Sequence, residues 1–353
     1  MLQRQFVVKP DTQCLLHVTA TQYWLPEFMA HWDDDEALTL IMLHSTSFHK
    51  ETWEPTIQHI FKSLLVPSSR IEPRTASKLT KVKCAWAIEC PNHGQSAVLN
   101  DAALRNPQYF RKFGCEKYAE AVHRFMTFGP VLSPPFDFKA QRLVGIGHSL
   151  GGVAIVILQD LQPSFPFFSV ILVEPLLSPQ GLEPLRPLQM RLVQGAYERR
   201  DVWPSREDAV EYLEANKYIA LWDRRVLELY VRYGLRSHPG AQHEVAPYTG
   251  VCLACSREEE VTMYRDSTGS NRGLEVLNKI CRHLPISVIF GGKNDWMPRS
   301  VQDTLVDPNS GRRFETVHRI NGVGHLVPQH APEKLSRSVI DILTRHSRHA
   351  TRL

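Results

Sequence analysis

Short apolar runs bounded by turn residues recur along the chain and alternate with stretches of helical spacing. A continuous apolar run is typical of a parallel strand, because such a strand is buried on both faces. Helical spacing at Lys117–Phe128 and Val153–Leu161 lies between such runs. This alternation predicts an α/β fold with a doubly wound, mostly parallel sheet. The expected strands are Leu15–Thr19, Leu38–Leu43, Cys84–Ile88, Arg142–Ile146, Phe168–Val173, Ile286–Phe290 and Phe314–Ile320.

One interval, residues 176–283, interrupts this alternation. It contains no convincing buried strand and is rich in helix formers and aromatic residues, with helical spacing at Glu207–Tyr218, Leu221–Tyr233 and Glu258–Tyr264. Such a length is too great for an ordinary connection between strands. We therefore expect a core made of residues 1–175 and 284–353, with residues 176–283 inserted as a helical cap. A surface loop is expected at Leu64–Lys81.

The strongest chemical signal is the segment Gly147–Gly152, which reads G-H-S-L-G-G and directly follows a predicted strand. G-x-S-x-G between a strand and a helix is the context of a nucleophile elbow, in which glycines permit a sharp turn around the serine. The turn exposes the first backbone N–H groups of the next helix, which stabilise negative charge. Ser149 is therefore the predicted nucleophile, and the N–H of Leu150 a predicted oxyanion donor.

A serine hydroxyl needs a general base to react at neutral pH. The chain has 16 histidines, and most histidines are structural or solvated. His325 differs because it lies in the glycine-containing segment Gly322–Pro328, just after the last predicted strand. We expect it to reach the carboxyl edge of the sheet and to accept the proton of Ser149.

Several longer strings extend these motifs: Asn92–Val98, Gly147–Gly152, Leu161–Pro163, Ile171–Pro175 and Gly324–Val327. On them the chain resembles the α/β-hydrolases, and within these a fungal group that includes a yeast peroxisomal lipase and toxin-biosynthesis hydrolases. The resemblance implies hydrolysis of an ester, thioester or lipid, with a cap that sets the choice of substrate.

The acid of a triad follows the serine and precedes the histidine in this fold. Asp295 follows the strand Ile286–Phe290 and is framed by glycines and a proline, so it is the expected acid. The alternative is Glu174, which ends the strand Phe168–Val173. Some members of the fold place the acid there, although a buried structural carboxylate would have the same pattern.

A second oxyanion donor is expected in the loop after Leu38–Leu43, from the N–H of Thr46 or Ser45. Ser45 stands where the fold usually has glycine. The segment Asn92–Ser96 partly matches a structural turn of the family, so His93 is not expected to be catalytic.

Composition excludes several other classes. The formal net charge is +4, without nucleic-acid-binding spacing, so no nucleic-acid partner is expected. The pair Cys252 and Cys255 lacks further ligands at zinc spacing, so no metal or cofactor is implied. No apolar segment is long enough to span a bilayer, which predicts an intracellular, soluble protein. The sequence gives no prediction of oligomeric state. Thr351–Leu353 partly fits a peroxisomal address that an import receptor would read.

The predicted function is therefore that of a serine hydrolase acting on a small acyl substrate, lipid-like or from secondary metabolism. Two alternatives remain open. One is acyl transfer or carbon–carbon chemistry on a polyketide-like metabolite with the same serine and histidine. The other is a non-catalytic binding protein, since a fold alone does not establish function.

Overall fold

The structure is a computed structural model that describes residues 1–65, 80–130, 132, 136–241 and 249–350. Most of the loop predicted at Leu64–Lys81 and the whole of Thr351–Leu353 lie outside these residues, so the peroxisomal address stays a prediction. None of the helices in the described ranges combines the length and apolar character that crossing a bilayer requires.

An eight-stranded sheet forms the core, in the order β1-β2-β4-β3-β5-β6-β10-β11. β1 pairs antiparallel with β2, and β2 antiparallel with β4, whereas all the other neighbours are parallel. The predicted α/β fold with a mostly parallel sheet is thus confirmed. The strands are β1 Leu2–Val8, β2 Val18–Trp24, β3 Leu38–Leu43, β4 Val82–Ile88, β5 Arg142–His148, β6 Phe167–Val173, β10 Ile286–Gly291 and β11 Thr316–Ile320.

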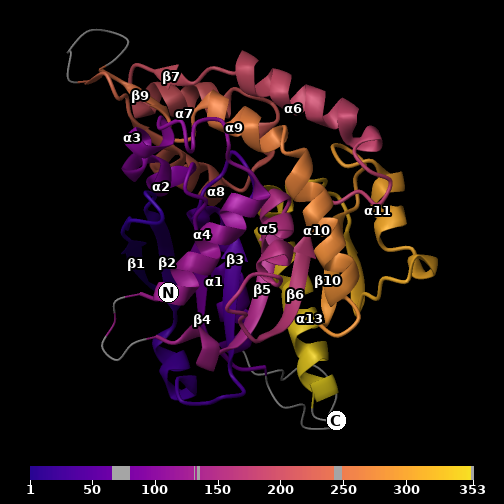
Figure 1. Ribbon diagram of the computed structural model, residues 1–353. Coiled ribbons are helices and arrows are strands. Elements are labelled where there is room, and N and C mark those ends of the chain that lie inside the picture. Colours follow the sequence, from indigo (N-terminus) through magenta and orange to yellow (C-terminus); the bar gives the residue numbers. More distant parts are fainter. Residues whose placement is uncertain (66–79, 131, 133–135, 242–248, 351–353) are drawn as a thin grey trace.

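Helices cover both faces of this sheet (Figure 1). On one face α4 (Cys115–Phe128), α5 (Leu150–Leu158) and α10 (Ser267–Ile280) share one apolar cluster with side chains of the strands. On the other face α1 (Glu54–Leu65) and α13 (Pro332–Ala350) share a second cluster. Alternate strand residues belong to different clusters, which explains why the strand sequences are apolar throughout. The shorter helices are α2 Gly94–Leu99, α3 Asp101–Leu104, α11 Arg299–Leu305 and α12 Val327–His330.

Residues 176–283, called the insert below, connect β6 to β10. Helices α6 (Arg186–Glu198), α7 (Arg206–Glu214), α8 (Arg224–Leu229) and α9 (Arg257–Tyr264) lie in it. Figure 1 shows α6, α7 and α9 together at one end of the main sheet.

Two expectations about the insert are wrong. It is not purely helical, because β7 (Val202–Trp203), β8 (Leu235–Ser237) and β9 (Val251–Leu253) form a small antiparallel sheet. Its last helix, α10, also packs on the core: a Cβ on Gly273 would lie 2.6 Å from Cγ1 of Val153 in α5. α10 therefore packs with the core helices, although the expected cap extended to residue 283.

Candidate active site

Ser149 occupies a sharp turn between β5 and α5. Its backbone φ is +53°, a left-handed conformation that is strained for a residue with a side chain. The turn is possible because Gly147 and Gly151 lie against backbone: a Cβ on either would collide with main-chain atoms. The Ser149 N–H donates to the Val173 carbonyl at 2.9 Å, which ties the turn to β6. The geometry is that of the nucleophile elbow expected from the motif.

His325 lies in the loop between β11 and α12, and its ring faces Ser149. The distance from Nε2 to the Ser149 Oγ is 3.1 Å. The backbone carbonyl of His325 accepts a hydrogen bond of 2.9 Å from Nε2–H of His148. Burial lowers the pKa of His148 well below its usual value, so its ring is a neutral donor that fixes this carbonyl.

The carboxylate beside the His325 ring belongs to Glu174. Its Oε2 lies 3.1 Å from Nδ1 of His325, and the side chain is 1% exposed. Its Oε1 accepts hydrogen bonds from the Gly291 N–H at 2.6 Å and from Nε2 of Gln302 at 3.0 Å. Three groups, from the histidine loop, β10 and α11, thus contact one carboxylate and hold it in a single orientation.

The expectation that Asp295 contacts the imidazole is therefore wrong. Asp295 accepts through Oδ1 from the backbone N–H of His325 at 3.0 Å and of Trp296 at 2.6 Å. Its carboxylate also fills the space beside Gly324, where a Cβ would collide with it. Asp295 thus holds the backbone of the histidine loop, while the alternative residue, Glu174, holds the ring.

The loop after β3 lies beside Ser149, as expected. Ser45 and Thr46 line the same cavity as Ser149 and Leu150. In the described part of the chain, the N–H groups of Thr46 and Leu150 donate to no protein acceptor. Both amides are therefore available to an oxyanion at Ser149, although this role is still a prediction.

Two buried histidines hold this loop. Nε2 of His44 accepts from the Cys90 N–H at 3.1 Å, and its Nδ1–H donates to the Ser45 carbonyl at 2.8 Å. Nε2 of His93 accepts from the Ser47 N–H at 3.0 Å. Burial lowers the pKa of His44 to about 3 and that of His93 well below its usual value, so both rings are neutral at pH 7.

A polar cluster connects the loop to the insert, and sequence reasoning missed it. The Ser47 hydroxyl contacts the Glu260 carboxylate and lies 2.6 Å from the Tyr264 hydroxyl. Glu260 also forms an ion pair with Arg199 at the end of α6. The sequence signal was weak, because Glu260 is one of three consecutive glutamates that resemble the first turn of a solvated helix.

A cavity of about 370 Å³ lies beside Ser149 and His325. One face of α6 lines it, with Leu188, Leu192, Gly195, Ala196 and Arg199 at helical spacing. Aromatic residues of the insert add to the wall, and they include Tyr212, Tyr218 and Trp222. The lining is therefore mainly apolar, and most of it comes from the insert.

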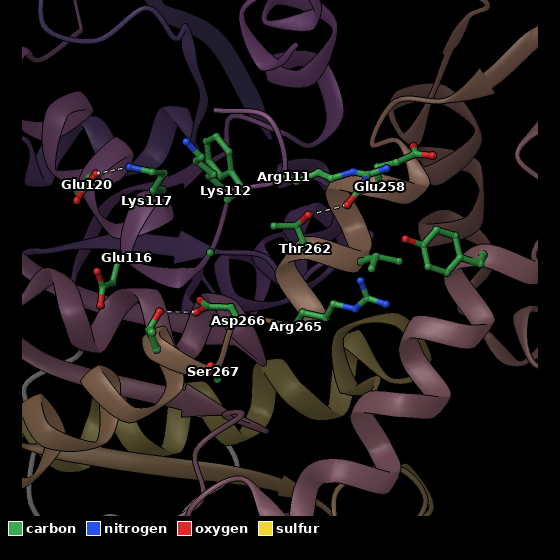
Figure 2. A pocket seen from close by; sticks show the side chains of 15 residues that line it. Arg111, Lys112, Glu116, Lys117, Glu120, Glu258, Thr262, Arg265, Asp266 and Ser267 are labelled. Carbon is green, nitrogen blue, oxygen red and sulfur yellow. Dashed lines mark hydrogen bonds and ion pairs between the residues drawn. The ribbon is translucent and has the colours of Figure 1, made fainter. Parts of the chain in front are cut away.

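A second cavity, of about 410 Å³, has a polar lining from the N-terminal part of α4 and from α9. Figure 2 shows both basic and acidic side chains around it, among them Arg111, Arg265, Glu116 and Glu258. Ser149, Glu174 and His325 are not part of its lining, so the reactive groups lie elsewhere. Among the residues with described positions, no group of three or more histidine, cysteine or acidic side chains could hold a metal ion.

Comparison with known proteins gives consistent results. Over 228 residues the chain is 32% identical to the abhydrolase domain-containing protein AKT2 of Alternaria alternata, which covers 57% of this chain and 82% of that protein. It is 28% identical over 214 residues to the type I acyl-CoA thioesterase mpaH of Penicillium roqueforti, covering 58% of this chain and 41% of that protein. The chain spans less than half the length of two of these relatives, covering 41% of mpaH and 44% of the abhydrolase domain-containing protein AFT2-1 of Alternaria alternata.

Among solved structures, the peroxisomal alpha-beta-hydrolase Lpx1 of Saccharomyces cerevisiae has a TM-score of 0.71 at 18% identity, over 98% of this chain and 88% of that one. At this identity the likeness shows a shared fold. Residues 40–337 match the alpha/beta hydrolase family. This match covers most of the chain, including the elbow, Glu174 and the histidine loop, and the chain therefore belongs to the alpha/beta hydrolase family.

Proposed function

We propose that this chain is a serine hydrolase that cleaves an ester or thioester through an acyl-enzyme, with Ser149 as nucleophile, His325 as base and Glu174 as acid. The observation that carries the proposal is the unbroken series of contacts from Ser149 Oγ to Nε2 of His325 and from its Nδ1 to Glu174. A mainly apolar cavity at the reactive serine provides room for an acyl chain.

The geometry supports a two-step mechanism. Because Nδ1–H donates to Glu174, Nε2 of His325 is free to accept the Ser149 proton as Oγ attacks the carbonyl carbon. The N–H groups of Leu150 and Thr46 bind the oxyanion. His325 then gives its proton to the leaving oxygen or sulfur. In the second step His325 takes a proton from a water molecule as the water oxygen attacks the acyl carbon. It gives this proton to Oγ as the bond between Ser149 and the acyl group breaks, which releases the acid.

The relatives support ester or thioester chemistry because one of them is an acyl-CoA thioesterase by name. The cavity favours apolar acyl groups, since burial of each methylene contributes about 0.8 kcal/mol. The insert supplies most of the wall, so we propose that it acts as the cap that selects the substrate.

Fluorophosphonate labelling and a panel of p-nitrophenyl esters and acyl thioesters test this function. We expect the wild type to label at Ser149 and to turn over medium-chain substrates. In H₂¹⁸O the released acid should gain one heavy oxygen. Transfer of the acyl group to another acceptor would instead give an acylated acceptor without heavy oxygen. A folded protein that neither labels nor releases acid would refute the proposal and favour a binding function.

A further inference from the structure

The charges that line the cavity beside Ser149 are not balanced. Three arginines line it, Arg191, Arg199 and Arg200, and the only carboxylate among its lining residues is Glu260. All three arginines come from α6 or from the two residues that follow it. Cationic groups around a mainly apolar cavity attract an anion. Arg191 and Arg200 are exposed to solvent, so this attraction should weaken as the salt concentration rises.

Only one of the three arginines is neutralised by the protein. Arg199 forms an ion pair with the buried Glu260 carboxylate. In the ranges that the structure describes, neither Arg191 nor Arg200 forms an ion pair with a carboxylate. Arg191 donates to the Asp295 backbone carbonyl at 3.5 Å and Arg200 to that of Val202, and neither carbonyl carries a charge. The positive charge of both groups therefore remains available to a bound anion.

Aromatic rings position both free arginines. The Arg191 guanidinium carbon lies 5.7 Å from the centroid of the Trp296 ring, which in turn stacks on the His325 ring at 6.3 Å and 15°. The Arg200 guanidinium carbon lies 5.5 Å from the centroid of the Tyr212 ring, and Nε of Arg200 donates to the Val202 carbonyl at 2.9 Å. These contacts restrict the side chains without using up their charge, which favours ligand binding because less rotational freedom is lost.

We infer that the substrate carries an anionic group, a carboxylate or a phosphate, and that Arg191 and Arg200 bind it while Ser149 attacks the acyl carbon. The inference rests on the proposed hydrolase function and names the substrate class of the same site. The anion can belong to either part of the substrate. A phosphate would come from the leaving group, as in a coenzyme A thioester, and a carboxylate from the far end of the acyl chain.

Two matched substrate pairs test the inference and separate the two sources. The first pair is octanoyl-4′-phosphopantetheine and octanoyl-pantetheine, which differ only in the phosphate of the leaving group. The second is a p-nitrophenyl ester with a terminal carboxylate on the acyl chain and the same ester with that carboxylate methylated. We expect wild-type kcat/KM to favour the charged member of one pair by about tenfold or more, a ratio equivalent to one charge-assisted contact.

The variants are Arg191→Gln, Arg200→Gln and the double variant, with Arg191→Lys and Arg200→Lys to retain the charge. The matched control is Arg186→Gln on the same helix, because Arg186 is exposed and pairs with Glu183 outside the cavity. The double glutamine variant should lose the preference of kcat/KM for the charged substrate. The decrease of this preference with rising NaCl concentration, expected for the wild type, should also be absent. The lysine variants should retain part of both, and Arg186→Gln should retain both in full.

Binding measurements separate a failure of this inference from a failure of the proposed function. Calorimetry compares Ser149→Ala with the triple variant that also has Arg191→Gln and Arg200→Gln. Coenzyme A and a medium-chain dicarboxylic acid are the two ligands. At least one of them should bind Ser149→Ala at least tenfold more tightly than it binds the triple variant. Turnover without any arginine-dependent preference or binding would overturn the inference and leave the hydrolase function standing. Arginine-dependent anion binding without turnover of any substrate would support the anion site and refute the function.

Discussion

Glu174 Oε2 lies 3.1 Å from Nδ1 of His325, although 151 residues separate the two in sequence. The contact forms because Glu174 directly follows β6, the strand that neighbours β5 and the serine turn. Glu174 adopts a φ of +47°, a strained backbone conformation like that of Ser149. The two strained residues directly follow adjacent parallel strands, so both lie at the same edge of the sheet.

Replacing the acid gives the first prediction. Glu174→Gln should lower kcat by about 10⁴-fold, because an amide cannot stabilise the imidazolium and can force the wrong tautomer. Asp295→Asn should have a much smaller effect, since the amide oxygen can still accept the His325 backbone N–H. Steady-state kinetics on one p-nitrophenyl ester would compare the two, with circular dichroism as a check on folding. A larger loss in folded Asp295→Asn would return the role of acid to Asp295.

The nucleophile gives the second prediction. Ser149→Ala should lower kcat by about 10⁶-fold and abolish covalent labelling by a fluorophosphonate, because no other group can form the acyl-enzyme. The matched control is Ser178→Ala, which removes a buried hydroxyl outside the cavity lining. Intact-mass spectrometry after labelling reports the result directly. Stoichiometric labelling of Ser149→Ala would show that another residue is the nucleophile.

The size of the cavity gives the third prediction. Gly195 lines the cavity, and a Cβ built on it has no neighbour within 4 Å, so a larger side chain there would occupy free space. In the wild type, kcat/KM should rise about fourfold per added methylene until the cavity is full. Gly195→Phe should move this plateau to shorter acyl chains.

Gly195→Ala is the matched control for that experiment. It should leave the plateau nearly in place and stabilise the protein by up to about 1 kcal/mol, because alanine is the better helix former. The measurement is a chain-length profile from acetate to dodecanoate esters. An identical plateau in Gly195→Phe would mean that the acyl chain binds elsewhere.

The buried histidines give the fourth prediction, on stability against pH. The pKa of His44 is about 3 in the folded protein because burial disfavours its charged form, and that of an unfolded histidine is about 6.5. Below pH 6.5 the unfolded chain therefore binds a proton that the folded chain does not. The free energy of unfolding should fall as the pH drops from 6.5 towards 3, and His44 alone should account for about 1 kcal/mol of this loss at pH 5.5.

Urea unfolding at pH 7.5 and pH 5.5 measures this effect. His44→Gln should be less stable than the wild type at pH 7.5 but should lose less stability on acidification. His93 and His148 act in the same direction, since burial also lowers their pKa values. The exposed His283 supplies the control variant, His283→Gln, which should retain the wild-type pH dependence. The prediction would be contradicted if His44→Gln and the wild type lost the same unfolding free energy between pH 7.5 and pH 5.5.

Local sequence was sufficient to predict the positions of Ser149 and His325. Ser149 directly follows the buried strand β5, and His325 lies in the glycine-containing loop after β11. Such turns are restricted enough to be recognised from a few residues. The order of chain elements likewise predicted the mostly parallel sheet. The edge strand β1 was not predicted, because its side chains are largely exposed and lack a strong apolar pattern.

The acid could not be chosen from sequence, because Glu174 and Asp295 both follow buried strands. The distinction depends on which backbone N–H groups compete for each carboxylate, and that competition appears only in the folded chain. The small sheet of the insert was missed for a related reason. Its strands have two or three residues each, which is too short for an alternating pattern to be detected.

The position of Glu174 on β6 has an evolutionary consequence for the segment Gly292–Pro298. In a protein whose acid follows β10, any insertion or substitution in that segment risks the reaction itself. In this protein Trp296 of the segment lines the cavity, and the Asp295 carboxylate accepts a hydrogen bond from the backbone N–H of His325. Related sequences should therefore diversify at Trp296 to accommodate different substrates, while Glu174 and Ser149 remain invariant on their neighbouring strands.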